Sequence, residues 1–249
     1  MQTLAGKIAV ITGGNSGIGK ATARLFVQQG AKVVITGRRQ SVLDAAVTEI
    51  GPGVVGIPGD SSDIAHHTHL AYEVRRRFGG LDIFVANAGV INLVPSDKVT
   101  VEDYDHQFGV NARGVFFGVQ AMLPIMRDGG SIILVSSIAA RKSLDNHAVY
   151  AGSKAAIGAF ARAWALELKA RKIRVNVLSP GPVETPILDK LGVTEKERPD
   201  FVKAMGSMIP LGRMGLPEDL ASAALFLACD AGSFITGIEL TVDGGMSLT

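Results

Sequence analysis

A tyrosine and a lysine separated by three residues, Tyr150 and Lys154, are the side chains of this sequence best suited to proton transfer. Residues i and i+4 share one face of a helix, so we expect the phenol and the ammonium to be neighbours. A free phenol has a pKa of about 10 and is a poor base near neutral pH. A nearby ammonium stabilises the phenolate, so we expect a lowered pKa and a role for Tyr150 as general acid or base.

Pairs with this spacing arise readily by chance on helix surfaces, so the pair needs support from its surroundings. The apolar run 131–135 predicts a buried strand that ends at Ser136 and Ser137. A hydroxyl at that point can hydrogen-bond a substrate oxygen as charge develops there. A glycine-rich turn lies upstream, and we therefore place a reaction centre near Ser137, Tyr150 and Lys154.

The turn 12–19 reads TGGNSGIG and follows the first apolar run. Its glycines let the backbone turn sharply and approach a ligand without a Cβ in between. The helix that follows offers free N–H groups and a positive dipole end to a pyrophosphate. A tight strand–helix connection without a ligand is the alternative, but the strand before and the helix after favour dinucleotide binding. The expected cofactor contacts are Gly13, Asn15, Ser16, Gly17, Ile18 and Gly19.

The second strand is expected to end beside the adenosine ribose, where an acidic residue would bind the 2′-hydroxyl of NAD. This chain has Gly37, Arg38 and Arg39 there instead. The glycine leaves room, and the two guanidinium groups can pair with a 2′-phosphate. Two solvated arginines are the alternative. The pattern favours NADP(H) over NAD(H).

The third and fourth apolar runs end at polar or small residues, Asp60 with Ser61 and then Asn87, Ala88 and Gly89. Open α/β sheets bind ligands at the carboxyl ends of their strands. We expect Asp60 to accept a hydrogen bond from the adenine amino group and Ser61 to offer a backbone N–H. Asp60 as the cap of the next helix is a second reading that does not exclude the first.

Short runs of branched apolar residues alternate with helical patterns along the whole chain. Continuous apolar runs are typical of strands buried on both faces of a parallel sheet. We predict an α/β fold, a single-domain Rossmann fold over residues 1–249, with a doubly wound parallel sheet of about seven strands and helices on both faces. The runs are 8–11, 32–35, 54–57, 81–85, 131–135, 173–178 and 238–242.

Composition argues against several classes of protein. Hydrophobic residues make up 47% of the chain and the net charge is +2, which is unlike a disordered protein. The balance of 25 Lys+Arg against 23 Asp+Glu argues against a nucleic-acid partner. No apolar stretch is long enough to span a membrane, and residues 1–7 lack a signal-peptide pattern. Because Cys229 is the single cysteine, we expect a cytoplasmic protein without internal disulfides.

Three histidines, His66, His67 and His69, resemble a metal-binding cluster. No cysteine joins them, and no full ligand set is apparent. His67 falls on the apolar stripe of the predicted helix, whereas the other two point elsewhere. We expect the solvated start of a helix here and no metal.

Taken in order, these features resemble the short-chain dehydrogenase/reductase family, in the group with a TGxxxGxG turn and a YxxxK pair, close to the carbonyl and 3-oxoacyl reductases. The resemblance covers essentially the whole chain. One departure is Ala86, where many members have an asparagine before Asn-Ala-Gly. The matching elements are 12–19, Asp60, Asn87 to Gly89, Asn111, Ser137, Tyr150 with Lys154, 180–185 and Asp243 to Gly245.

The resemblance implies a role for each of these groups. Tyr150 is the general acid in reduction and the base in oxidation, while Ser137 holds the substrate oxygen. Lys154 lowers the pKa of the phenol and binds the nicotinamide ribose. Asn111, at a kink in its helix, holds a water that links Lys154 to solvent protons. The residues expected around the nicotinamide carboxamide are Pro180, Gly181, Val183 and Thr185.

The helical segments 113–126 and 155–168 are apolar nearly all round. A helix packed on a sheet needs only one apolar stripe. The second apolar face predicts burial against another subunit, and we expect a homotetramer. Deeper burial within the monomer is the alternative.

The segment 186–210 follows the sixth strand and mixes apolar residues, including Leu191, with charges. We expect a lid over the substrate, with a structural helical insertion as the alternative. Together with 90–94 and 138–147, it is expected to set specificity. We expect an apolar lining with few charges, which favours an uncharged, fairly hydrophobic ketone or secondary alcohol.

Two other functions are weighed against a ketone reductase. A 3-oxoacyl-[acyl-carrier-protein] reductase usually has a basic residue directly before the fifth strand. This chain has RDGG at 127–130, which is a less basic segment at that position. A non-catalytic nucleotide-sensing scaffold is disfavoured because the four catalytic positions Asn111, Ser137, Tyr150 and Lys154 are all filled.

Overall fold

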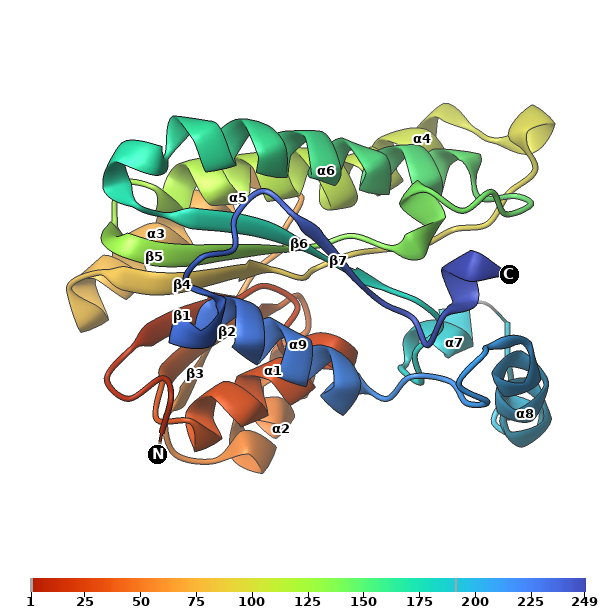
Figure 1. Ribbon diagram of the computed structural model, residues 1–249, viewed down its shortest axis with the longest axis horizontal. Helices are drawn as coiled ribbons and strands as arrows, with labels where there is room; N and C mark the ends of the chain where they lie inside the picture. The colour runs from red at the N-terminus through yellow and green to blue at the C-terminus, as the bar shows by residue number, and fades with distance from the viewer. Residues whose placement is uncertain (1, 191) are drawn as a thin grey trace.

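The branched apolar runs form the strands of a parallel sheet at the centre of the molecule (Figure 1). The computed structural model describes residues 2–190 and 192–249. Within these residues the sheet has seven strands in the order β3-β2-β1-β4-β5-β6-β7, and each neighbouring pair is parallel. The strands are β1 Ile8–Ile11, β2 Lys32–Gly37, β3 Val54–Pro58, β4 Leu81–Ala86, β5 Met126–Val135, β6 Arg174–Pro180 and β7 Glu239–Val242.

Helices cover both faces of this sheet, because parallel strands must be joined by crossovers. In Figure 1, α1, α2 and α9 lie below the sheet, and α3, α5 and α6 lie above it. The helices are α1 Gly17–Gln28, α2 Gln40–Ile50, α3 Ile64–Phe78, α4 Val101–Phe108, α5 Gly114–Met122, α6 Ala148–Glu167, α7 Ile187–Lys190, α8 Arg198–Met208 and α9 Pro217–Ala228. The predicted fold class is confirmed.

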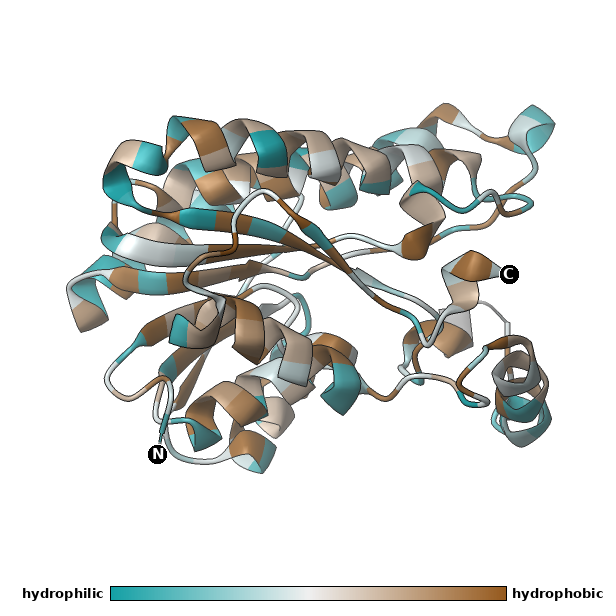
Figure 2. Cartoon of the chain, viewed as in Figure 1, coloured by the Kyte–Doolittle hydropathy of each residue, from teal (hydrophilic) through white to brown (hydrophobic). Residues whose placement is uncertain are grey.

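Each strand contributes side chains to two separate cores. Val10 and Phe84 pack with the helices on one face, whereas Ile11 and Val85 pack with those on the other. Figure 2 shows hydrophobic residues along the central strands, between the two helical layers. The strands are therefore buried on both sides, which explains why their sequences are continuous apolar runs.

The direction in which the chain winds reverses between β1 and β4. From β1 the chain moves outward to β2 and β3, and it then returns to form β4 on the other side of β1. Crossovers on the two halves then lie on opposite faces, so a crevice opens at the carboxyl ends of β1 and β4. The site residues predicted from the sequence follow these strand ends.

The three histidines differ from the sequence-based expectation. His66 and His67 are 7% and 1% exposed, so the start of α3 is not a solvated segment. His67 was expected on the apolar stripe, but His66 is buried as well, because its ring packs onto Gly59, which has no side chain. His69 is exposed.

The segment 127–130 also differs, because it is part of β5 rather than a loop before it. Arg127 donates a hydrogen bond to Asp82 over 2.7 Å and is held at the start of the strand. The start of a parallel strand lies at the edge of the sheet opposite the crevice. Arg127 is therefore not placed to receive a carrier protein at the active site.

Two short helices, α7 and α8, form the segment between β6 and α9. Apolar residues of this segment, Leu188, Ile209 and Met214, form a small core of their own with Ile138 and Met246. Leu191, which we placed among its apolar residues, lies outside the described residues. Within the described chain, no helix is long and apolar enough to cross a membrane.

Candidate active site

The glycine-rich turn after β1 is attached to the end of β4 by side-chain hydrogen bonds. The hydroxyl of Thr12 accepts from the backbone N–H groups of Asn87 and Ala88, each over 3.1 Å. The Asn87 amide donates to the carbonyl oxygens of Thr12 and Gly13, over 2.9 and 3.2 Å. These four bonds hold the two strand ends together where the crevice opens.

The turn leaves no space for side chains at its glycines. A Cβ on Gly13, whose φ is +64°, would lie 3.0 Å from the Cα of Ala88. A Cβ on Gly19 would lie 2.4 Å from the carbonyl oxygen of Gly13. The first turn of α1 thus packs directly on the loop, which brings its free N–H groups to the position expected for a pyrophosphate.

At the end of β2, Arg38 and Arg39 are both exposed. One guanidinium nitrogen of Arg38 lies 4.0 Å from a carboxylate oxygen of Asp60. Arg39 is the residue that precedes α2. The side chain of Asn15 packs over Gly37, where a Cβ would lie 2.6 Å from it. The two cations are accessible to a ligand that follows the turn toward β2.

Asp60 at the end of β3 binds its own loop. Its carboxylate accepts from the backbone N–H and the hydroxyl of Ser62, each over 2.8 Å. Partial burial opposes ionisation, but these hydrogen bonds and the charge of Arg38 together lower the pKa of Asp60. The alternative in which Asp60 caps the next helix is wrong, because Asp63 accepts from Ala65 N and caps α3.

Ser137, Tyr150 and Lys154 come together at the end of β5. Ser137 lies two residues after the strand, and the other two lie on the first turns of α6. The hydroxyl of Ser137 lies close enough to the phenol of Tyr150 to influence its pKa. Lys154 is only 4% exposed, and its ammonium donates to the carbonyl oxygen of Val135 over 2.9 Å. The helix therefore brings the phenol and the ammonium to one edge of the sheet.

The pKa of Tyr150 does not follow the sequence-based expectation. Burial raises it, and the hydroxyl of Ser137 opposes that rise only in part. The expected lowering by Lys154 is absent because the ammonium is directed at Val135. Burial lowers the pKa of Lys154 itself to about 8. Both groups are thus shifted toward their uncharged forms.

Asn111 lies in the middle of a single π-helical turn, Gly109–Arg113, which is the expected kink. Its amide oxygen accepts from Val90 N, and its amide nitrogen donates to Val90 O, each over 2.9 Å. The same nitrogen donates to the hydroxyl of Ser153 over 3.0 Å. Asn111 therefore fixes the loop after β4 to α6. Gly89 in this loop lies against Lys154, whose ammonium would be 3.1 Å from a Cβ there.

Ser153 was not among the residues that we expected at the site. Its hydroxyl accepts from Asn111 and donates to the carbonyl oxygen of Tyr150 over 2.7 Å. A serine within a helix carries no clear signal in the sequence, since its partner Asn111 is 42 positions away.

The residues after β6 face the glycine-rich turn. Gly181 N donates to Val242 O over 3.0 Å, and Pro180 is the last residue of the strand. Val183 is buried, and the methyl group of Thr185 would lie 3.1 Å from a Cβ on Gly17. The site therefore includes the ends of β1 to β6. The predicted site residues follow these strand ends in the sequence.

The comparisons with known proteins agree with this geometry. A family model described as Enoyl-(Acyl carrier protein) reductase matches residues 13–247. Oxidoreductase asL5 of Sarocladium schorii is 42% identical, over 99% of this chain and 98% of its own length. The 2,5-dichloro-2,5-cyclohexadiene-1,4-diol dehydrogenase LinX of Sphingobium indicum is 38% identical, over 98% of each chain.

A hydroxynaphthalene reductase-like protein, Arp2 of Metarhizium brunneum, is 37% identical over 98% of this chain and 96% of its own. Among solved structures, a short-chain dehydrogenase/reductase of Brucella melitensis, described as glucose/ribitol dehydrogenase, superposes with a TM-score of 0.92. It is 32% identical and covers 98% of each chain.

The hydroxyl of Thr12 offers a test of how the two strand ends are joined. Thr12→Val keeps the shape but leaves the N–H of Ala88 without this acceptor, so we expect a loss of about 1–3 kcal/mol in the free energy of unfolding. Thr12→Ser is the matched control, because it keeps the hydroxyl and is expected to lose much less. Denaturant unfolding of both variants measures the difference, and equal losses would contradict this role for the hydroxyl.

Proposed function

Because this chain belongs to the short-chain dehydrogenase/reductase family, we propose that it is an NADP(H)-dependent oxidoreductase that interconverts a ketone and a secondary alcohol. The observation that carries the proposal is the pair of neighbouring hydroxyls on Ser137 and Tyr150, together with the buried ammonium of Lys154. A carbonyl oxygen placed between the two hydroxyls would receive two hydrogen bonds at once. The nicotinamide cofactor, when bound, supplies or accepts the hydride.

In the reductive direction, Tyr150 donates its proton to the carbonyl oxygen while Ser137 holds that oxygen in place. The raised pKa of Tyr150 keeps the phenol protonated at neutral pH, which suits an acid. In this proposal, Lys154 binds the nicotinamide ribose. Asn111 keeps Val90 and the preceding Gly89 in position beside Lys154. The relay water that the family resemblance assigns to Asn111 stays a prediction.

The remaining cofactor contacts follow the order of the strand ends. The turn with Gly13, Asn15, Ser16, Gly17, Ile18 and Gly19 binds the pyrophosphate. Asp60 and Ser61 meet the adenine, Asn87 to Gly89 line the crevice, and Pro180, Gly181, Val183 and Thr185 surround the carboxamide. The glycines that no side chain could replace support this assignment.

The preference for NADP(H) is supported by two exposed guanidinium groups and by the lack of an acid at the end of β2. Arg38 is close to Asp60, but exposed pairs of this kind are weak, so the guanidinium is free to turn to a phosphate. A bidentate pair with a 2′-phosphate is a strong charge-assisted contact.

Arg38→Gln tests the cofactor preference. We expect it to weaken NADPH binding about tenfold or more, because one charge-assisted hydrogen bond to the 2′-phosphate is lost. NADH binding is expected to change little, since NADH has no phosphate there. Arg75→Gln, at an exposed position in α3, is the matched control. Fluorescence titration with both cofactors decides the matter, and equal affinities in the unchanged protein would contradict the preference.

For the substrate, we propose an uncharged, fairly hydrophobic ketone enclosed by the lid segment 186–210. The apolar core that this segment forms with Ile138 supports closure over an apolar ligand. The names of two relatives mention a hydroxynaphthalene and a cyclohexadienediol, which are cyclic and uncharged. A panel of cyclic ketones, scored by NADPH oxidation, tests the proposal.

A 3-oxoacyl-[acyl-carrier-protein] reductase is the second candidate, and the matched family model names a carrier-protein substrate. Reduction of a carrier-bound 3-oxoacyl chain in preference to its free thioester would favour it. A nucleotide-sensing scaffold would bind NADPH but reduce none of these compounds.

Tyr150→Phe tests the mechanism. We expect it to keep the fold and the cofactor affinity but to lower kcat by about 10²–10⁴-fold, because only the proton-donating hydroxyl is lost. Tyr72→Phe, in the exposed part of α3, removes a hydroxyl elsewhere and is expected to leave kcat unchanged.

The pH profile provides a second measurement on the same group. In the unchanged protein, ketone reduction is expected to be level near neutral pH, because Tyr150 stays protonated there. It should fall above about pH 8, where Lys154 loses its ammonium charge. Reduction that rises steadily through pH 9, or a Tyr150→Phe variant with near-normal kcat, would show that another group carries the proton.

We further propose a homotetramer in which α5 and α6 form one interface, and β7 with residues 246–249 a second. The support is a line of exposed apolar residues on α6, Ala155, Ala159, Ala163 and Leu166. Light scattering is expected to give a tetramer for the unchanged protein and a smaller species for Ala159→Arg, because the arginine blocks close contact. A stable monomer at micromolar concentration would refute this assembly.

A cytoplasmic location is the last part of the proposal. Its support is the use of a single cysteine, Cys229, which fits a reducing compartment.

A further inference from the structure

Two buried histidines lie directly beneath the loop that follows β3. His66 and His67 occupy the first turn of α3, and their ring centroids are 5.7 Å apart. Neither takes part in the chemistry proposed above. Burial lowers the pKa of both rings, so both are neutral at physiological pH.

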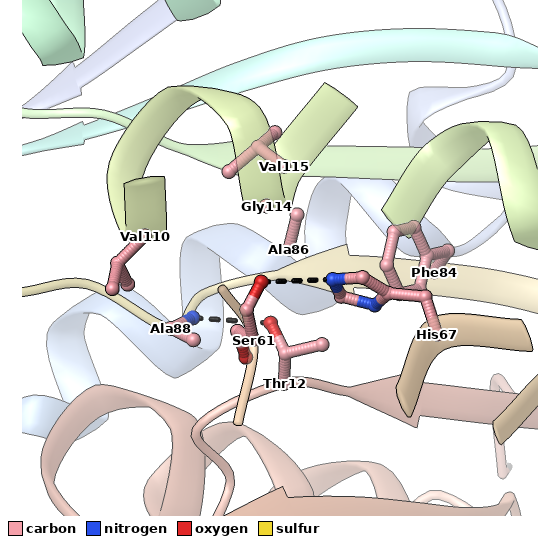
Figure 3. Close-up of a pocket in the computed structure, with 9 residues that line it drawn as sticks. All are labelled: Thr12, Ser61, His67, Phe84, Ala86, Ala88, Val110, Gly114 and Val115. Carbon is pink, nitrogen blue, oxygen red and sulfur yellow. Dashed lines mark hydrogen bonds between the residues drawn. The ribbon is translucent and has the colours of Figure 1, made fainter. Parts of the chain in front are cut away.

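His67 forms one hydrogen bond, to the carbonyl oxygen of Ser61 over 2.9 Å (Figure 3). A carbonyl oxygen only accepts, so the Nε2 atom of His67 carries the hydrogen and donates it. The other ring nitrogen, Nδ1, is then a bare acceptor, and it has no partner among the described residues. A branched apolar side chain would fill this position without leaving a buried polar atom unpaired. Compared with such an apolar side chain, the imidazole adds only the hydrogen bond to the carbonyl oxygen of Ser61.

The carbonyl group of Ser61 is held tightly from the opposite side as well. A Cβ on Gly114 of α5 would lie 2.1 Å from this oxygen, so the helix backbone packs directly against it. The ring of His67 also packs on α5, because a Cβ on Gly118 would lie 3.1 Å from it. The peptide between Ser61 and Ser62 is thus fixed between the ring of one helix and the backbone of another.

Packing alone does not fill the space around this peptide. A cavity of about 10 Å³ lies between Ser61, His67, Thr12 and Ala88 (Figure 3). This volume is at the lower limit for a single water molecule, so the cavity is not a ligand site. Because this space is unfilled, close packing against the ends of β1 and β4 does not by itself prevent a shift of the loop toward them. The hydrogen bond from His67 is the directional contact that opposes such a shift.

His66 completes the support on the other side of the loop. A Cβ on Gly59 would lie 1.9 Å from the Nδ1 atom of His66, so the ring occupies the space of the missing side chain. The two rings therefore contact the loop at Gly59 and at Ser61, on both sides of Asp60.

We propose that His67 is a positioning residue for the adenine end of the cofactor, acting through the carbonyl group of Ser61. Holding that carbonyl fixes the plane of the peptide between Ser61 and Ser62, and the N–H of this peptide donates to the carboxylate of Asp60 over 2.8 Å. This inference rests on the proposed function, in which Asp60 and Ser61 meet the adenine. Because the adenine is common to NADPH and NADH, His67 affects both cofactors alike.

The test compares His67→Gln with His67→Asn. The amide nitrogen of glutamine reaches about as far as Nε2 of histidine, whereas that of asparagine stops near Nδ1. We expect His67→Gln to bind NADPH within about twofold of the unchanged protein, and His67→Asn to bind it about tenfold more weakly, the cost of one lost hydrogen bond. His69→Asn, at the exposed neighbour, is the control.

Two further readouts separate positioning from general damage. The weakening in His67→Asn is expected to be the same for NADPH and NADH, so their affinity ratio stays constant, in contrast with Arg38→Gln. Nicotinamide mononucleotide, which has no adenine, is expected to bind all variants equally. The KM for a ketone at saturating NADPH should also stay unchanged.

Equal NADPH affinities for the Gln and Asn variants would overturn the role of His67. A loss of mononucleotide affinity as large as the loss for NADPH would also overturn it, because that loss marks a distorted fold. If the unchanged protein binds neither NADPH nor NADH, the proposed function itself fails. Should His67→Asn not fold, His67→Leu takes its place in the same titrations, with the same expected and opposing results.

Discussion

The four hydrogen bonds among Thr12, Gly13, Asn87 and Ala88 join the two halves of the sheet at the point on which the site depends. The chain winds outward from β1 in one direction and from β4 in the other, so nothing in the sheet ladder alone fixes the loops that follow them. All strands are parallel, and every predicted site residue therefore lies at one edge. Once the first turn is fixed to β4, the loops after β3, β5 and β6 are arranged around it.

Burial is the second constraint, and it sets the charges at the reaction centre. Lys154 has no carboxylate partner in the described residues, and burial lowers its pKa to about 8. Burial raises the pKa of Tyr150. Each shift favours the neutral form, but a pKa of about 8 leaves Lys154 charged at neutral pH, so the centre holds one buried positive charge beside a neutral phenol. An acid with a raised pKa suits reduction, whereas a base for oxidation requires the ammonium to turn from Val135 toward the phenol.

The sequence predicts those structural features that depend on residues close together in the chain. Continuous branched runs predict the strands, and the spacing of Tyr150 and Lys154 places both on one helix. Contacts between segments that are far apart in the chain could not be predicted in this way. The burial of His66 depends on a bare backbone at Gly59, and the bonds of Asn111 depend on Val90, 21 positions away. We expected 127–130 before the fifth strand, but β5 begins at Met126, and these residues form an irregular stretch between the pairs that Met126 and Ser131 make with β4.

The substrate side shows why specificity is the hardest property to obtain from sequence. The loop after Ser137 is held by contacts with the last strand. Arg141 pairs with Glu239 over 2.7 Å, and Glu239 also accepts from Ser179 over 2.7 Å. Lys142 donates to the main chain of Thr249. Glu239 thus connects the loop after Ser137 to Ser179, the residue before the Pro180–Gly181 turn. The position of the loop after Ser137 therefore depends on how β7 lies on β6, and no local motif encodes that.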